Sequence, residues 1–265
     1  MKLISISALV LSISMLCSCG GKEENSKTGD SAKTGGDTVA TVKLSPEMEA
    51  LSARFKASDT WPYKVDSLRI EDITKADSLS AAEVKILSSV QAKHELTDAA
   101  EWDLKSFYKI DSIKSKNGYA KYCEGLDIGM IKYANAYALD KLVMDEHTTL
   151  LVWGLRTESY EACPYSHDKS VYFTIIRDGA VSGGFLLGRL MGAADAPVYM
   201  NAQIQGNLEK DGRFTLEARS INNDEGSEDF EMLEKARYTG QVTDGKLGAV
   251  TDVKEKPVKV AIKKS

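Results

Sequence analysis

The chain has 265 residues and a formal net charge of −5, with 43% hydrophobic and 28% charged residues. This length gives room for one large domain, or for a small subdomain beside a larger one. An acidic balance without a strong basic stripe disfavours nucleic acid as a partner, because phosphate contacts dominate that kind of affinity.

Residues 1–18 have the features of an export signal. One cation, Lys2, precedes an uncharged run over residues 3–17. The run is long enough for the hydrophobic part of a signal peptide and too short to span a bilayer as a permanent helix. We therefore expect residues 1–18 to be removed, which takes Lys2 from the chain and lowers the net charge from −5 to −6.

The signal ends in Leu16-Cys17-Ser18-Cys19, with an aliphatic residue three positions before a cysteine and a small residue directly before it. This ending resembles the lipobox of bacterial lipoproteins. The resemblance implies cleavage after Ser18 and attachment of diacylglycerol to Cys19, which would anchor the protein in the outer membrane. Cys17 is the alternative lipidation site, but it would put the bulky Leu16 at the small position.

Residues 19–43 are rich in Gly, Ser, Thr, Lys and Asp and contain no aromatic residue. Such a segment cannot bury enough apolar surface to fold, so it is expected to be a flexible tether. Its Lys22-Glu23-Glu24 resembles the short acidic signal that directs many Bacteroidetes lipoproteins to the cell surface. An ordinary solvated charge run is the alternative, so both a periplasmic and a surface-exposed location stay open.

Asp-Ser and Asp-Thr pairs followed by a small or aliphatic residue also resemble an O-glycosylation motif of exported Bacteroidetes proteins. The candidate acceptors are Ser31, Thr38, Ser67, Ser78 and Ser112. Asp-Ser pairs are also favoured at turns and helix starts, which would explain some of them.

Residues 44–118 are predicted to form a helical N-terminal segment. Ser45-Pro46 is a good helix start, and Ser80 with Glu83 forms a capping box for a second helix. A third helix is expected to begin near Asp98 and to end at Asn117-Gly118.

Residues 119–265 are predicted to form an antiparallel β domain, because apolar and polar residues alternate along several segments such as 198–208. Asp178-Gly179, Asp211-Gly212 and Asp244-Gly245 predict tight hairpins. The fold class is therefore α+β, with the helical segment packed on an antiparallel sheet that forms a sandwich or a curled half-barrel.

Cys123 and Cys163 remain after removal of the signal. Outside the cytoplasm two thiols usually form a disulfide, so we expect a Cys123–Cys163 bond, with free buried thiols as the alternative. A metal site that combines Cys163 with His167 is disfavoured, because too few further ligands are near in the sequence. The acidic segment 222–231 departs from calcium-loop spacing and is expected to be a mobile hairpin tip.

Tyrosines and a tryptophan on the predicted strands suggest a surface that stacks on sugar rings or on a protein partner. The candidates are Tyr133, Tyr137, Trp153 and Tyr199. The alternative is that these aromatic residues occupy ordinary half-buried strand positions.

No catalytic, metal or nucleotide motif stands out, and no cofactor is expected. The sequence favours a non-catalytic, lipid-anchored envelope or surface module that binds a protein or glycan. An envelope hydrolase and an immunity-type inhibitor lipoprotein are the alternatives.

Overall fold

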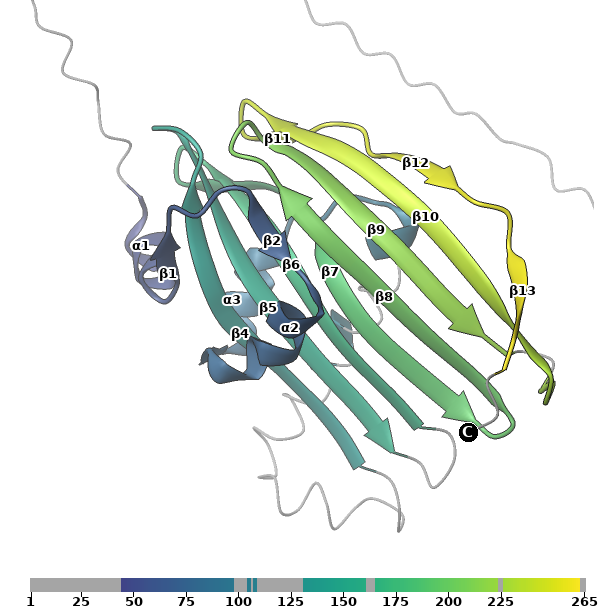
Figure 1. Ribbon diagram of the computed structural model, residues 1–265. Coiled ribbons are helices and arrows are strands. Elements are labelled where there is room, and N and C mark those ends of the chain that lie inside the picture. The colour runs from purple at the N-terminus through teal and green to yellow at the C-terminus, as the bar shows by residue number, and fades with distance from the viewer. Residues whose placement is uncertain are drawn as a thin grey trace, which may run out of the picture. The chain divides into compact units, whose positions relative to one another are not determined.

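The protein is described here from a computed structural model that covers residues 44–97, 104–105, 107–108, 131–160, 165–223 and 226–262. Of residues 131–133 and 159–160 only the backbone is described. The described part is mostly a mixed, largely antiparallel β-sheet with a few short helices (Figure 1). The signal segment, the tether, Cys19, Cys123 and Cys163 lie outside the described residues.

Seven long strands form an antiparallel meander in chain order, each paired with the next over at least part of its length. They are β4 (Ile131–Val143), β5 (Thr148–Tyr160), β6 (Tyr165–Arg177), β7 (Ala180–Asp195), β8 (Val198–Leu208), β9 (Arg213–Asn222) and β10 (Phe230–Thr243). Three short strands then pair with β10, namely β11 (Lys246–Leu247), β12 (Thr251–Lys254) and β13 (Val258–Ala261). The strand-rich C-terminal part agrees with the alternation in the sequence.

Two of the three predicted tight hairpins are present, whereas Asp211-Gly212 is part of a longer connection over residues 209–212. Asp178 and Gly179 join β6 to β7 with positive φ angles of 48° and 82°, and Asp244 and Gly245 join β10 to β11 with 50° and 67°. Positive φ angles at both central residues are typical of the two-residue turn whose twist matches that of paired strands. Gly212, with φ of 84°, lies in the connection between β8 and β9.

The N-terminal part alternates short helices with short strands. The elements are α1 (Pro46–Ala53), β1 (Lys56–Ser58), β2 (Tyr63–Val65), α2 (Ser67–Glu71), the 3₁₀ helix η1 (Asp72–Lys75), β3 (Asp77–Leu79) and α3 (Ala81–Leu87). Ser45 caps α1, and Ser80 with Glu83 forms the capping box of α3, as the sequence predicted. The strands β1, β2 and β3 were not expected. Among the described residues, no helix is long and apolar enough to cross a membrane.

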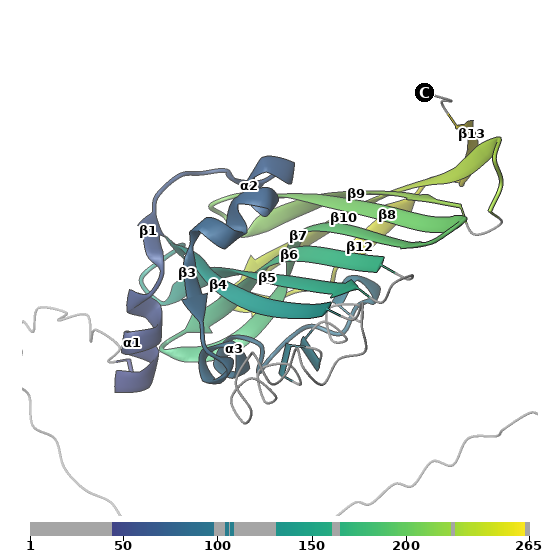
Figure 2. The same cartoon turned by 90° about the horizontal axis from the view of Figure 1, so that it is seen from below.

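The sheet folds over itself where β7 meets β8. β7 pairs with β8 only through residues 189–195, whereas residues 206–208 of β8 pair with β2. The two long strands cross so closely that a β-carbon on Gly206 would lie 2.0 Å from the carbonyl oxygen of Leu187. Beyond this crossing, β8, β9 and β10 pass over β4–β7, as Figure 2 shows.

The folded sheet encloses the aromatic core of the protein. The ring of Phe214 on β9 lies 5.8 Å from Phe173 on β6 and 5.6 Å from Phe185 on β7, measured between ring centroids. All three side chains are buried. On the opposite face of β6, Thr174 donates a 2.7 Å hydrogen bond to the carbonyl oxygen of Leu87 in α3.

Candidate functional site

The four aromatic residues proposed from the sequence do not form one surface. Trp153 on β5 is fully buried; its ring stacks on Tyr172 at 4.6 Å and its indole N–H donates to Thr174 at 3.0 Å. Trp153 is therefore a core residue and offers no surface to a partner.

The other three lie on β4 and β8. Tyr133 and Tyr137 are on β4, where Tyr137 is half-buried against the core. Tyr137 is paired with Gly154 and therefore lies on the face opposite to that of Trp153. Tyr199 is half-buried on β8 and donates a 2.6 Å hydrogen bond to Glu231 on β10.

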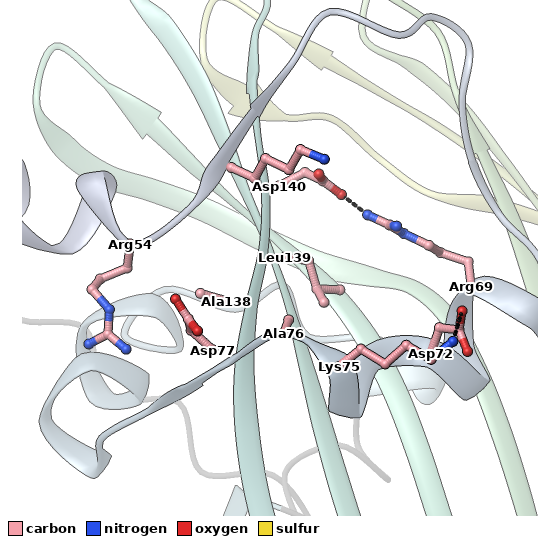
Figure 3. A pocket seen from close by; sticks show the side chains of 10 residues that line it. Arg54, Arg69, Asp72, Lys75, Ala76, Asp77, Ala138, Leu139 and Asp140 are labelled. Atoms are coloured by element: carbon pink, nitrogen blue, oxygen red, sulfur yellow. Dashed lines mark hydrogen bonds and ion pairs between the residues drawn. The ribbon is translucent and has the colours of Figure 1, made fainter.

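A charged pocket of about 370 Å³, which we call the edge notch, lies beside β4 (Figure 3). Along the same edge of β4, β3 pairs antiparallel with residues 136–138 and β1 pairs parallel with residues 140–142. Leu139 between them is the extra residue of a β-bulge, because Ala138 and Asp140 pair with consecutive residues of β5. A bulge moves the following side chains to the other face, which brings Asp140 to the face where Ile73 of η1 contacts Gly154.

Asp140 is the centre of a buried polar network in the edge notch. Its carboxylate accepts a 2.5 Å hydrogen bond from the Tyr63 hydroxyl and forms an ion pair with Arg69 of α2. Burial, reinforced by the Asp140 carboxylate, raises the pKa of the Tyr63 hydroxyl well above its ordinary value. The hydroxyl therefore stays protonated and acts as a donor.

Other charged side chains of the edge notch also have partners within the protein. Lys75 pairs with Asp72 at 2.8 Å, and Arg54 pairs with Glu83 at 2.9 Å while it donates to the Ser78 carbonyl at 2.7 Å. The contacts of Arg54 join the end of α1 to β3 and α3, and the Lys75–Asp72 pair lies within η1. We interpret the edge notch as a structural joint between the N-terminal elements and β4.

A second pocket, of about 260 Å³, lies across the middle strands of the sheet, and we call it the cross-strand trough. Its lining residues come from α2 and from β6 to β9: Glu71, His167, Leu190, Met191, Asn201, Ala202, Gln203, Arg219 and Ile221. Strand pairing places the central residues in a straight row from His167 through Gly192, Asn201 and Ile221 to Leu233. Paired residues of neighbouring strands share a face, so this row is one continuous surface.

Gly192 lies beneath the side chains of two trough residues, His167 and Asn201. A β-carbon there would lie 2.4 Å from Cε1 of His167 and 2.9 Å from Oδ1 of Asn201, so the imidazole and the amide converge over the missing side chain. The ring of Tyr165 lies 5.3 Å from that of His167. Nδ1 of His167 is buried without a hydrogen-bond partner among the described residues, an unsatisfied group of the kind that often marks a functional site.

The charges along the trough are unevenly balanced. At one end Lys169 pairs with Glu71. Gln203, which is directly opposite Arg219, donates a 2.6 Å hydrogen bond to Ser67. At the other end Arg219 is exposed and has no hydrogen bond or ion pair within the described part of the chain. Lys235 of β10 is directly opposite Arg219, and its nearest carboxylate is Glu255 at 4.0 Å. Like charges directly opposite on paired strands are unfavourable, so this end of the trough is suited to an anion.

A buried ion pair supports the trough from the other face of β6 and β7. Asp168 follows His167 in β6, and its carboxylate pairs with Arg189 of β7 and accepts a 2.6 Å hydrogen bond from Ser170. Burial raises the pKa of Asp168, and Arg189 opposes that rise.

Two of the glycosylation candidates lie in the described residues. Ser67 is the first residue of α2, where Asp66 caps the helix, and its hydroxyl accepts hydrogen bonds from Gln203 and Gln205. Ser78 is exposed on β3. Ser31, Thr38 and Ser112 lie outside the described residues.

The acidic segment 222–231 connects β9 to β10, with Asp224 and Glu225 outside the described residues. The Asn223 side chain closes this connection by bonding both the N–H and the carbonyl of Ser227. Across the described residues, no group of three or more His, Cys, Asp or Glu side chains is arranged to hold a metal ion.

Alternation could have placed Asn201 and Gln203 on a polar face, but only the register of four strands brings them beside His167 and Arg219. Sequence reasoning considered His167 only as a partner of Cys163. Comparisons with known protein families, with curated proteins and with solved structures found no match to this chain.

Proposed function

We propose that this protein is a non-catalytic binding module, anchored in the outer membrane by lipid on Cys19 and exposed to the periplasm or to the cell surface. Its ligand is a protein or a glycan of the envelope, bound in the cross-strand trough. In this proposal the helical N-terminal segment packs on the curled sheet and fixes the α2 side of the trough.

One observation carries the proposal, namely that side chains with unused hydrogen-bonding capacity line the cross-strand trough. Asn201 and Arg219 are exposed and have no side-chain partner within the described residues, and both line the trough. Surface side chains with free donors around a concave floor are the elements by which a binding site orients a ligand. The tether suits such a module, because it gives a lipid-anchored domain reach.

The test compares wild type with the double variant Asn201→Ala and Arg219→Ala. Both side chains are exposed without partners in the described residues, so the thermal midpoint should stay within a degree or two of wild type. Capture of a defined envelope component from detergent-solubilised membranes should be lost. Arg213→Ala is the matched control, because Arg213 is on the same face of β9 as Arg219 but pairs with Asp211 outside the trough. Equal capture by wild type and the double variant would contradict the proposal.

A further inference from the structure

We propose that the ligand of the cross-strand trough is an acidic oligosaccharide whose sugar carboxylate binds Arg219. This inference rests on the proposed function and names the class of ligand for the same site.

The charge at one end of the trough points to an anion. Arg219 and Lys235 are directly opposite each other, and Arg219 has no carboxylate partner in the described part of the chain. The nearest acidic side chain on its own strand face, Glu217, is engaged by Arg237 at 2.8 Å. A carboxylate bound between the two cations would relieve their repulsion and accept charge-assisted hydrogen bonds from the guanidinium.

The sheet face that continues from the trough suits sugar rings rather than an extended acidic peptide. Tyr165 and Tyr199 flank the small residue Ala194 on adjacent strands, so their backbones are separated by about 10 Å, twice the strand spacing. Aromatic rings at that separation offer two apolar surfaces, and Asn201 and Gln203 between them and Arg219 offer amides for hydroxyl groups. A sugar presents both an apolar ring face and a rim of hydroxyls, which matches this order of side chains.

The trough also limits where the acid group can sit. The carboxylate of Glu71 lies at the opposite end and is paired with Lys169. The carboxylate of Glu231 accepts a hydrogen bond from the hydroxyl of Tyr199. An acidic group would be repelled from both of those positions. The single favourable place along the row is therefore the Arg219 end, which fixes the direction in which the oligosaccharide lies.

The experiment measures binding of three probes to the full-length protein in detergent micelles by calorimetry. The probes are a short oligogalacturonate, the same oligosaccharide with its carboxylates methyl-esterified, and a polyglutamate peptide of equal charge. We expect the oligogalacturonate to bind at least about tenfold more tightly than its methyl ester, since a charge-assisted hydrogen bond is worth about that much. It should also bind at least about tenfold more tightly than polyglutamate, which has carboxylates but no ring faces to pack on the tyrosines.

Variants connect this preference to the trough. Arg219→Gln should weaken oligogalacturonate binding about tenfold and abolish the preference over the methyl ester, while Arg219→Lys should restore part of it. Arg213→Gln is the control and should bind like wild type, because Arg213 pairs with Asp211 outside the trough. The inference is overturned if the methyl ester or polyglutamate binds as tightly as the oligogalacturonate, or if Arg219→Gln binds unchanged.

The outcome separates this inference from the proposed function. If the Asn201→Ala and Arg219→Ala variant loses capture of an envelope component but wild type binds no oligogalacturonate, the trough is a binding site and the ligand class is wrong. If neither capture nor oligogalacturonate binding depends on the trough, both proposals fail.

Discussion

The hydroxyl of Tyr63 donates a 2.5 Å hydrogen bond to the carboxylate of Asp140, across 77 residues of sequence. This contact joins β2, which pairs with β8, to β4 at the far side of the folded sheet. Both side chains are buried, so the bond is shielded from water. It is one of the contacts by which the two layers of the sheet are held in register.

Replacing Tyr63 with Phe should therefore reduce the free energy of unfolding by about 1–3 kcal/mol, because it leaves a buried carboxylate with one donor fewer. Denaturant unfolding followed by circular dichroism measures the change. Tyr199→Phe is the matched control and should cost less, since its bond to Glu231 is only partly buried. Equal losses in the two variants would show that burial of the Tyr63–Asp140 bond is unimportant.

The raised pKa of Tyr63 predicts a loss of stability at alkaline pH. In the unfolded chain the hydroxyl ionises near its ordinary value of about 10, whereas in the folded protein it keeps its proton. The contribution of this group is therefore fully present below pH 10 and declines as pH rises further. The free energy of unfolding measured between about pH 9 and pH 11 should fall more steeply for wild type than for Tyr63→Phe.

The buried pair of Asp168 and Arg189 predicts a different pH dependence. Arg189→Met would leave the Asp168 carboxylate buried without its cation and should cost about 3–5 kcal/mol at neutral pH. The deficit should shrink as pH falls toward about 4, because a protonated Asp168 needs no cation. The double variant Asp168→Asn and Arg189→Met should be more stable at neutral pH than Arg189→Met alone. A deficit of Arg189→Met that does not vary with pH would contradict this explanation.

The crossing of β7 and β8 predicts that Gly206 tolerates no side chain. In Gly206→Ala the new methyl group would meet the Leu187 carbonyl, so the strands must separate, at a cost of about 1–3 kcal/mol or more. Gly248→Ala is the control, because Gly248 is exposed and its β-carbon would lie 3.3 Å from the nearest atom, the Gln241 carbonyl oxygen. Thermal unfolding of the two variants beside wild type gives the comparison.

The proposed anchor is tested by metabolic labelling with a fatty-acid probe. Wild type should be labelled and Cys19→Ala should not, because the lipid is expected on the thiol of Cys19. Labelling that persists in Cys19→Ala and disappears in Cys17→Ala would move the attachment site to Cys17.

Much of the strand pattern could be predicted from the sequence, because alternation along a strand such as β8 reports directly on which face is buried. Helix starts at Pro46 and Ala81 were also predictable, since a cap acts through residues three or four positions away. The strands β1, β2 and β3 could not be predicted in this way. Each has three residues, too few to show alternation, and each is held by a partner far away in the sequence.

The candidate site was less predictable than the fold. Aromatic residue type suggested Trp153 as a binding residue, but the stacking of Trp153 on Tyr172 depends on the register of β5 and β6, which composition does not reveal. The convergence of His167 and Asn201 over Gly192 likewise depends on three strands being in register. Sequence analysis named Tyr199 as a candidate, but it did not identify the row of residues beside it.

The three short strands also have a consequence for how the protein is made. The hairpins of the meander close between neighbours in the chain and can form quickly, whereas β1, β2 and β3 need places that only β4 and β8 create. In the proposed export the chain crosses the inner membrane N-terminus first, so residues 56–79 reach the periplasm before the strands with which they pair. We therefore expect residues 56–79 to stay unpaired in the periplasm until β4 has emerged, and residues 63–65 until β8 has emerged. A chaperone that holds extended chains would find its binding site there.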